Sequence, residues 1–372
     1  MKLTSRIITT DRTPVFAGDH ALASVDKLIS SLHLGRDGIF VLVDKNTKQH
    51  CLPLAVQKSV HLAGAVILEI DGGEASKSLL TAERLWKDLL AAGAGRRSLL
   101  VNLGGGVVSD LGGFVAAGYK RGIGYINIPT SLMGQADAAI GGKTSVNLGP
   151  VKNQVGFFYP AKGVFIFPGF QTTLSCDHLR SGMAEIIKSA IVGNARLWKR
   201  ILVYSPADLL GLAPEHPFRL ELLANAIRFK NEVVVKDFRE QKLRKVLNFG
   251  HTIGHALEAY SQAEGRNPML HGDAVAAGMV CAAFLSNRKT DLPTGEMVAL
   301  ISWITAGFPS YPVPGSDLQT IMELMKHDKK NTAGQIRFTL ISKPGIPRVD
   351  IACDPSEIIE ALACYQEPRQ VG

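Results

Sequence analysis

The chain has 372 residues, 46% of them hydrophobic and 20% charged, which is typical of a globular enzyme of about two domains with a large core. The formal net charge of +8 is not gathered into long lysine or arginine runs, and aromatic residues make up only 7%, so nucleic-acid binding is not indicated. Five scattered cysteines indicate no disulfide framework, and apolar runs too short for a bilayer lead us to expect a cytoplasmic, non-membrane protein without a signal peptide.

The first half of the chain, up to about residue 173, alternates short apolar runs with helical patterns. Short β-rich runs separated by helices indicate a mainly parallel sheet that is covered on both faces. The predicted strands are "IFVLVD" at residues 39–44, "AVILEI" at 65–70, "SLLVNL" at 98–103, "GYINIP" at 124–129 and "GVFIFP" at 163–168.

The second half has a different periodicity. Segments such as "HPFRLELLANAIRFKNEVVVKD" and "GDAVAAGMVCAAFLSNR" carry apolar residues three and four positions apart, which predicts helices, and only "QIRFTLIS" is strand-like. We therefore predict an α/β domain over residues 1–173 and an all-α domain over residues 174–372. We expect the site in the cleft between these halves.

A glycine-rich turn follows the third predicted strand. Gly104, Gly105 and Gly106 lead into a helix expected from Val107, so backbone N–H groups can approach a pyrophosphate at the positive end of that helix. Ser109 stands where the GxGxxG fingerprint has its third glycine. An ordinary tight turn is an equal alternative.

Charged residues follow two other predicted strands. Asp44 comes directly after a strand, where its carboxylate can either accept hydrogen bonds from ribose hydroxyls or cap the next turn. Glu74 and Lys77, in "GGEASK", are placed either to contact a nucleotide or to form a helix-cap pair.

Between residues 121 and 153 the chain offers Arg121, Asp137, Lys143 and Asn153. Cations and amides suit a phosphate, since cations neutralise its charge and amides donate hydrogen bonds. The last two residues lie in "GGKTSVNLGPVKN", which we interpret as glycine-rich loop, and lysines of such loops can equally be solvated.

The segment "RSGMAEIIKSAI" places Glu185 and Lys188 on one face of a helix expected to begin near Ser181. A pair at this spacing can be an ordinary surface ion pair. Its neighbours are apolar, however, which predicts a largely buried helix, and a buried charge needs a partner that a metal ion could supply.

Two histidines, His251 and His255, share a helical face in "NFGHTIGHALEAY", and His271 opens "HGDAV" farther along. Two histidines and one carboxylate suit zinc or a similar divalent ion in a catalytic site. The pair lacks the glutamate of HExxH, so a zinc-protease site is not indicated. A buried histidine that only satisfies its own hydrogen bonds is the alternative for each.

Eight blocks between about Phe40 and Leu340 follow one another in the order of a known family. They are "GGGVVSDLGGFVAAGYKRG", "IPTSLMGQADAAIGGKT", "KNQVGFFYP", "LRSGMAEIIK", "KNEVVVKD", "LRKVLNFGHTIGHALE", "HGDAVAAGM" and "DKKNTAGQIRF". On these blocks the chain resembles 3-dehydroquinate synthase, of the sugar phosphate cyclase superfamily.

The resemblance implies a metal centre for Zn2+ or Co2+ and a substrate site. The implied metal ligands are Glu185, His251 and His271. The implied catalytic residues are Lys143, Lys188, Lys230, Arg244, Asn248 and His255. The implied substrate and phosphate contacts are Arg121, Asp137, Asn153, Lys329 and Lys330.

The resemblance also implies NAD and a homodimer in which Arg121 reaches the site of the neighbouring subunit. The implied NAD contacts are Asp44, Asn46, Glu74, Lys77, Gly105, Gly106, Val107, Asp110, Thr130, Ser131, Asp137, Lys143, Lys152, Thr173 and Leu174. The chain departs from the family pattern at Ser109, Ser131, Phe238, Lys242 and Asp273. None of these is an expected metal ligand.

The implied reaction converts 3-deoxy-D-arabino-heptulosonate 7-phosphate to 3-dehydroquinate and phosphate. The steps are transient oxidation by NAD, phosphate elimination, re-reduction, ring opening and an intramolecular aldol closure. The substrate phosphate can take the proton in elimination, which leaves His255 to orient it, and the sequence leaves that acceptor open. Alternatives are a sister cyclase that makes 2-deoxy-scyllo-inosose or a valiolone, a glycerol-dehydrogenase-like oxidoreductase, and a non-catalytic binding protein.

Overall fold

The chain folds into two compact units. The computed structural model describes residues 6–8, 13–34, 38–149, 151–263, 265–326 and 335–367. One unit consists of Met1–Ser175 and Pro214–Phe238, and the other of Cys176–Ala213 and Arg239–Gly372. In these described ranges, no helix combines the length and the apolar character that a bilayer crossing requires.

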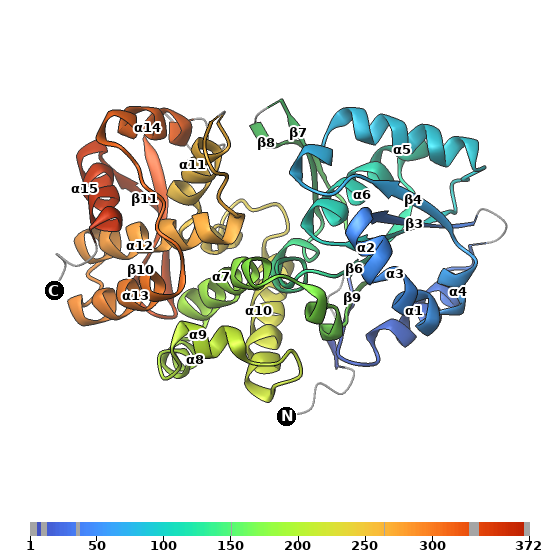
Figure 1. Cartoon of the computed structure of the whole chain (residues 1–372), viewed down its shortest axis with the longest axis horizontal. Coiled ribbons are helices and arrows are strands. Elements are labelled where there is room, and N and C mark those ends of the chain that lie inside the picture. The colour runs from blue at the N-terminus through green and yellow to red at the C-terminus, as the bar shows by residue number, and fades with distance from the viewer. Residues whose placement is uncertain are drawn as a thin grey trace. The chain divides into compact units, whose positions relative to one another are not determined.

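The first unit is an α/β domain (Figure 1). Its strands are β1 (Arg6–Ile8), β2 (Val15–Ala17), β3 (Ile39–Asp44), β4 (Val66–Ile70), β5 (Leu99–Gly104), β6 (Gly124–Pro129), β7 (Lys143–Leu148), β8 (Val151–Phe158) and β9 (Val164–Ile166). Its α-helices are α1 (Ala21–Ser31), α2 (Lys45–His50), α3 (Leu52–Lys58), α4 (Val60–Ala63), α5 (Leu79–Ala91), α6 (Gly106–Gly118) and α10 (Pro217–Lys236). Shorter helical turns are η1 (Glu74–Ser76), η2 (Tyr119–Arg121), η3 (Gly134–Ala138) and η4 (Pro168–Thr173).

A seven-stranded sheet, counted over the described residues, has the order β1-β2-β9-β6-β5-β3-β4. Its neighbouring pairs are parallel except β1 and β2. The predicted parallel sheet is therefore confirmed, and the five predicted strands correspond to β3, β4, β5, β6 and β9. The chain moves outward from β3 to β4 and returns to β5 on the other side of β3, and ligands commonly bind outside the carboxyl ends of strands at such a reversal.

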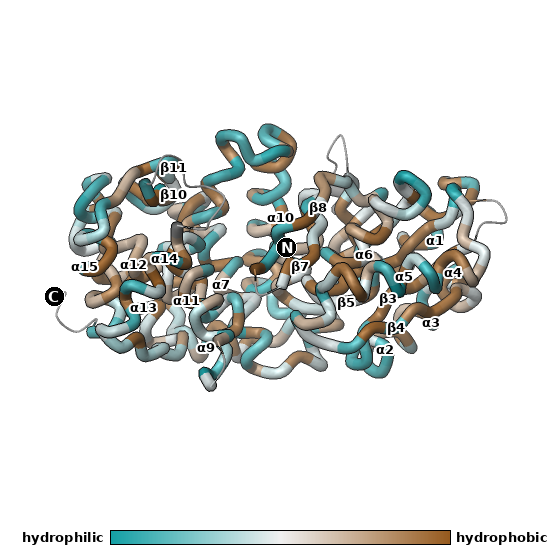
Figure 2. Tube along the Cα trace, turned by 90° about the horizontal axis from the view of Figure 1, so that it is seen from above, coloured by the Kyte–Doolittle hydropathy of each residue, from teal (hydrophilic) through white to brown (hydrophobic). Residues whose placement is uncertain are grey.

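Helices cover both faces of this sheet because its strands alternate. Phe40 and Leu42 pack with α5 and α6 in one hydrophobic core, whereas Val41 and Val43 pack with α1, α3 and α4 in another. Figure 1 shows these two groups of helices on opposite sides of the strands. Figure 2 shows the hydrophobic colour along β3 and β5, as expected for central strands buried on both faces.

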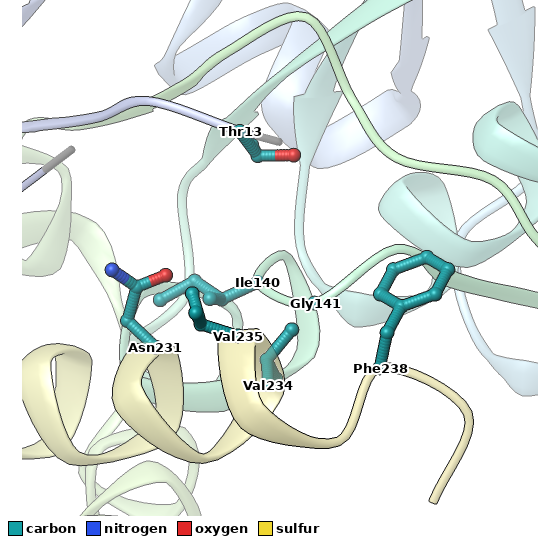
Figure 3. Close-up of a pocket in the computed structure, with 7 residues that line it drawn as sticks. All are labelled: Thr13, Ile140, Gly141, Asn231, Val234, Val235 and Phe238. Atoms are coloured by element: carbon teal, nitrogen blue, oxygen red, sulfur yellow. The ribbon is translucent and has the colours of Figure 1, made fainter. Parts of the chain in front are cut away.

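The two observed units differ from the predicted division between residues 173 and 174 in the placement of helix α10. The sequence assigned this helix to the second domain, but it packs against η3 of the first unit. Arg219 Nε donates to Gln171 Oε1 at 3.0 Å, and Lys230 Nζ donates to the Asp137 carbonyl at 2.6 Å. Figure 3 shows Thr13 facing Ile140 and the side chains of α10 across a cavity of about 20 Å³. Periodicity reveals a helix but not which unit it joins.

The second unit is largely helical. Its α-helices are α7 (Cys176–Gly193), α8 (Ala195–Ile201), α9 (Pro206–Gly211), α11 (His251–Ser261), α12 (His271–Lys289), α13 (Thr294–Gly307), α14 (Leu318–Lys326) and α15 (Pro355–Gln366). It also contains the turns η5 (Leu243–Asn248) and η6 (Gly315–Asp317) and the strands β10 (Ile336–Lys343) and β11 (Ile346–Cys353).

The two strands of this unit correct the prediction of an all-α second domain. β10 and β11 pair antiparallel, and β10 contains the segment that was strand-like in the sequence. β11 alternates polar and apolar residues only over residues 348–351, a short strand signal that was not singled out in the sequence. Helix α12 contacts α7, α11, α13, α15 and β10, which makes it the central element of the unit.

Candidate functional site

The expected nucleotide contacts of the first unit follow the carboxyl ends of adjacent strands. Asp44 ends β3, Glu74 and Lys77 follow β4, Gly105 follows β5, and Thr130 follows β6. Because the strand order is β4-β3-β5-β6, these ends share one edge of the sheet. Thr173 and Leu174, after β9, end the turn η4 next to this series. A dinucleotide would find hydrogen-bonding groups from several strands along this edge.

Asp44 already has a structural partner within the first unit. So has Glu74, whose contact with Asn147 is described below. Asp44 caps α2: its Oδ1 accepts the Thr47 backbone N–H at 2.8 Å, and Thr47 Oγ1 accepts the Asp44 backbone N–H at 2.9 Å. The capping interpretation of Asp44 therefore holds. Glu74 and Lys77 do not form a cap pair, since Ser78 caps α5 instead. Asn46 lies near the turn after β4, where a Cβ on Gly72 would be 3.7 Å from its Nδ2.

The glycine turn leads straight into α6, one residue before the predicted start at Val107. Gly105 is the N-cap and has extended backbone, and its lack of a side chain leaves the first-turn N–H groups open to an anion. A Cβ on Gly105 would lie 3.2 Å from Ser131 Oγ, so the turn packs closely against the segment after β6. The buried Ser109 keeps the helical hydrogen bond from its N–H to the Gly105 carbonyl at 3.0 Å.

Lys143 and Asn153 lie on a β-hairpin where the sequence predicted a loop. β7 and β8 pair antiparallel around Gly149, whose φ is +58°. Mixed polar and apolar residues between glycines hide this pairing in the sequence, because no apolar run marks either strand. Lys143 begins β7, and Lys152 and Asn153 stand on β8, with Asn153 in the left-handed region at φ +55°.

Hydrogen bonds join this hairpin to the nucleotide edge. Lys77 Nζ lies 2.5 Å from both Asp110 Oδ2 and Asn153 Oδ1. Asn147 of β7 donates its Nδ2 to Glu74 Oε1 at 2.9 Å and accepts the Asn153 backbone N–H at 3.0 Å. Burial raises the pKa of the Asp110 carboxyl, and the Lys77 ammonium opposes that rise. Sequence reasoning missed Asn147, because only its pairing on the hairpin reveals this contact.

Two further predicted residues of this unit have clear surroundings. Lys230 Nζ forms an ion pair with Asp137 Oδ1 at 2.7 Å in addition to its bond to the Asp137 carbonyl. Arg121 is exposed at the end of η2, and no hydrogen bond or ion pair of its side chain is found in the part of the chain that the structure describes. Its guanidinium is therefore available to another molecule.

In the second unit, helices α11 and α12 cross at glycines. A Cβ on Gly278 would lie 1.8 Å from the Gly250 carbonyl oxygen, and a Cβ on Gly254 would lie 2.8 Å from the Ala274 carbonyl oxygen. Gly250 itself has φ +79°, a conformation that favours glycine. Because the two backbones touch, the start of α12 lies beside the first two turns of α11, which brings His251, His255 and His271 together.

Glu185 and Lys188 lie on α7, which begins at Cys176 rather than near Ser181. Both side chains are only 1% exposed, as the apolar neighbours predicted, and Lys188 Nζ forms an ion pair with Glu185 Oε2. Neither carboxylate oxygen of Glu185 has a hydrogen-bond partner among the described residues. A buried carboxylate whose oxygens accept no hydrogen bonds would be stabilised by a further cation.

The histidines face this carboxylate. Glu185 Oε1 is 3.5 Å from His251 Nε2 and 3.7 Å from His271 Nε2. The Nδ1 atom of His251 lies 3.2 Å from the Phe249 carbonyl, which can only accept, so that nitrogen carries the hydrogen and Nε2 keeps a lone pair. His251, His255 and His271 also form a group whose possible ligand atoms lie within 4.8 Å of one another. The geometry therefore offers two histidines with Glu185, or three histidines, to a metal ion.

Other predicted residues lie on nearby elements of the same unit. Arg244 of η5 is 1% exposed, and Asn248 donates its Nδ2 to Glu240 Oε1 at 2.9 Å. Asp273 accepts hydrogen bonds from Arg180 Nε and Nη2, both at 2.9 Å, so this departure forms a bidentate clamp between α12 and α7. Lys242 is exposed. Lys329 and Lys330 lie outside the described residues.

Sequence comparison covers both units. Residues 67–181 match the 3-dehydroquinate synthase N-terminal family, and residues 182–331 match the 3-dehydroquinate synthase C-terminal family. The 3-dehydroquinate synthase of Parabacteroides distasonis is 40% identical over 331 residues, which cover 89% of this chain and 92% of the relative. That of Leptospira interrogans is 35% identical over 344 residues, with 89% and 93% coverage.

The chain belongs to the 3-dehydroquinate synthase family. Its activity is that of a 3-dehydroquinate synthase, a lyase, as the resemblance implied. A 2-deoxy-scyllo-inosose synthase solved with carbaglucose-6-phosphate, NAD+ and Co2+ is 27% identical, with TM-score 0.79 and coverage of 96% of this chain and 99% of its own.

More distant likenesses weigh against the alternatives. A valiolone synthase from Streptomyces hygroscopicus, solved with NAD+ and Zn2+, is 26% identical with TM-score 0.82, covering 98% of this chain and 99% of its own. Both sister cyclases are thus less similar in sequence than the 3-dehydroquinate synthases of the family. A protein from Sinorhizobium meliloti described as a "probable glycerol dehydrogenase" is 15% identical, so it shares the fold alone.

Proposed function

We propose that Glu185, His251 and His271 bind a divalent metal ion, Zn2+ or Co2+, and that His255 stands beside the substrate. The observation that carries this proposal is the buried Glu185 carboxylate. Among the described residues it accepts no hydrogen bond beyond its ion pair with Lys188, and the Nε2 atoms of both histidines lie 3.5 and 3.7 Å from Oε1. Two histidines and one carboxylate leave coordination positions open, as a catalytic metal requires. The sister cyclases solved with Co2+ and Zn2+ support the choice of ion.

We further propose that the carboxyl edge of the first unit's sheet binds NAD. Support comes from the side-chain-free N-cap of α6 at Gly105, which suits a pyrophosphate, and from the polar residues that end β3, β4 and β6. The cradle is narrow, since a Cβ at Gly105 or Gly106 would meet Ser131 or Ala138 at 3.2 to 3.4 Å. A larger residue at either glycine would occupy the space of the cofactor's phosphates.

The remaining predicted residues then divide by the substrate group they suit. Arg244 presents a planar guanidinium for the substrate carboxylate, while Lys143 and Asn153 present a cation and an amide for the phosphate. Bound NAD would supply a transient hydride acceptor, and the bound ion would supply a Lewis acid at the hydroxyl that is oxidised. Lys188, held beside Glu185 in a buried position, places a positive charge where substrate oxygen becomes electron-rich.

The ligand set is tested with Glu185→Gln, His271→Ala and His255→Ala in the full chain. Metal affinity is measured by competition with a chromophoric chelator, and turnover by phosphate release from 3-deoxy-D-arabino-heptulosonate 7-phosphate with NAD+ and Zn2+. We expect the first two variants to lose metal and activity together. His255→Ala should keep its metal and lose turnover by about 10²- to 10⁴-fold.

Loss of metal from His255→Ala, with retention in Glu185→Gln, would replace this set by the three histidines. Parallel assays on sedoheptulose 7-phosphate and glucose 6-phosphate should give no turnover. A chelator should abolish the activity.

We also propose a homodimer in which Arg121 acts in the partner's site, since its guanidinium is exposed and unbonded within the described ranges. Arg121→Ala and Glu185→Gln should each be inactive as pure dimers. After the subunits of both are mixed and exchanged, half the dimers are hybrids with one intact site, so about a quarter of wild-type activity should return. No recovery, in dimers that light scattering proves to be mixed, would contradict the shared site.

A further inference from the structure

Glu258 lies in the second unit, on the same helix as two of the clustered histidines. It follows His251 by seven residues, about two helical turns, so both face the same side of α11. Its side chain is only 6% exposed, and its Oε2 lies 3.0 Å from Nδ1 of His271. A buried carboxylate therefore meets the ring nitrogen of His271 that does not face Glu185.

This contact determines which ring nitrogen of His271 carries the hydrogen and which one keeps a lone pair. A carboxylate at Nδ1 keeps the hydrogen on that nitrogen, which leaves the lone pair on Nε2, the atom 3.7 Å from Glu185 Oε1. The negative charge also makes the imidazole a stronger donor to a metal ion. His271 is 35% exposed, so its ring is not held by tight packing alone.

Other contacts near His271 fix its backbone but not its ring. The Gly272 backbone N–H donates to Ser181 Oγ at 3.0 Å, and Arg180 clamps Asp273. A Cβ on Gly272 would lie 2.0 Å from the Ser181 carbonyl oxygen, so the start of α12 sits directly on α7. With the backbone placed in this way, rotation of the side chain remains, and the hydrogen bond to Glu258 restrains it.

We propose that Glu258 is a positioning residue that orients and polarises His271 as a metal ligand, without binding the metal itself. The proposal rests on the proposed ligand set of Glu185, His251 and His271. It forms a carboxylate–histidine–metal arrangement, in which loss of the outer carboxylate typically weakens metal binding by about 10- to 100-fold.

The test uses the full-length chain, stripped of metal and titrated with Co2+ in competition with a chelator, alongside the visible spectrum of the Co2+ form. Glu258→Ala should bind Co2+ about 10- to 100-fold more weakly. Glu258→Gln should lose less, because its amide oxygen accepts the same hydrogen bond without the charge. At saturating Co2+ its absorption bands should still shift, while the melting temperature of the metal-free protein stays at the wild-type value.

Asp317→Asn is the matched control. The Asp317 carboxylate, in η6, accepts hydrogen bonds from Tyr260, near the C-terminal end of α11, and from Arg266, which lies beyond that end. These contacts do not involve His271. The Co2+ affinity and spectrum of this variant should remain those of the wild type. Equal weakening in Asp317→Asn and Glu258→Ala would overturn the proposal, since general loosening of α11 would then explain both.

Failure of the inference and failure of the ligand set give different results. Wild-type affinity and spectrum in both Glu258 variants, with weak binding in His271→Ala, would overturn the role of Glu258 and leave the ligand set standing. Wild-type affinity in His271→Ala itself would remove the ligand set and the inference with it.

Discussion

The histidine cluster of the second unit and the hairpin of the first unit hold their polar residues in different ways. The histidines are placed by backbone contact between α11 and α12, where glycines leave no room for a side chain. The hairpin residue Asn153 is placed by hydrogen bonds to Asn147 and Lys77, and Asn147 in turn bonds Glu74. Close-packed backbones have one arrangement, whereas a half-buried polar network can rearrange at modest cost. We therefore expect changes at the glycine contact to act mainly on stability, and changes to the hydrogen bonds of the hairpin to act mainly on ligand affinity.

The largest effect should come from Lys188→Met in the metal-free protein. This change leaves Glu185 buried without its cation, which should lower the free energy of unfolding by roughly 3–5 kcal/mol. Denaturant unfolding followed by fluorescence of Trp198 and Trp303, both in the second unit, measures it. Saturating Zn2+ should restore more stability to the variant than to the wild type, because the ion gives Glu185 a new partner.

Lys245→Met is the control for that change. Lys245 pairs with Asp350 at 2.8 Å, but both side chains are partly exposed, so its loss should cost no more than about 1 kcal/mol. Equal losses in the two variants would mean that the buried pair does not stabilise the site as argued.

Gly278→Ala should come next and tests the backbone contact directly. Its Cβ would lie 1.8 Å from the Gly250 carbonyl oxygen, so α11 and α12 must separate. Overpacking typically costs about 1–3 kcal/mol, and so close a contact should lie at the upper end; the separation should also weaken Co2+ binding. Gly295→Ala, on α13 with nothing within 4 Å of the new Cβ, should leave both quantities unchanged or raise stability slightly.

The same contrast explains what could be read from the sequence. The spacing of His251 and His255 predicted a shared helical face, and the apolar neighbours of Glu185 predicted its burial; both features are local periodicity. The five predicted parallel strands were found because each is marked by a short, largely apolar run. Glu258 was not singled out, although its seven-residue distance from His251 was a signal that it shares the face of the histidines.

Features that depend on long-range pairing were not predicted. The hairpin has too few apolar residues to mark its strands, so Asn147 could not be connected with Glu74, which lies 73 positions earlier. Helix α10 was predicted as a helix, but its contacts with Gln171 and Asp137 decide which unit it joins. Such partners are fixed by the tertiary arrangement rather than by the pattern of the segment itself.

Asn147→Ala should shift ligand affinity more than stability. It removes two side-chain hydrogen bonds that join β7 to Glu74 and to Asn153, with a net effect of about 1 kcal/mol at a partly exposed site. We expect about fivefold weaker NAD+ binding by isothermal titration, with Co2+ affinity unchanged. Val151→Ala at the hairpin tip, where no side-chain hydrogen bond is lost, should leave NAD+ affinity as in the wild type.

The smallest effect should come from Phe238→Leu, at the C-terminal boundary of the first unit. The Phe238 ring packs on Phe158 with centroids 5.7 Å apart, and Phe158 pairs with Lys143 across the base of the hairpin. Loss of one aromatic pair should lower the free energy of unfolding by about 0.5–1.5 kcal/mol. Turnover should change less than twofold, because the hydrogen bonds of Asn147 and Lys77 still hold the hairpin. A large rise in KM for the phosphate substrate, without loss of stability, would instead give the ring a direct part in placing Lys143.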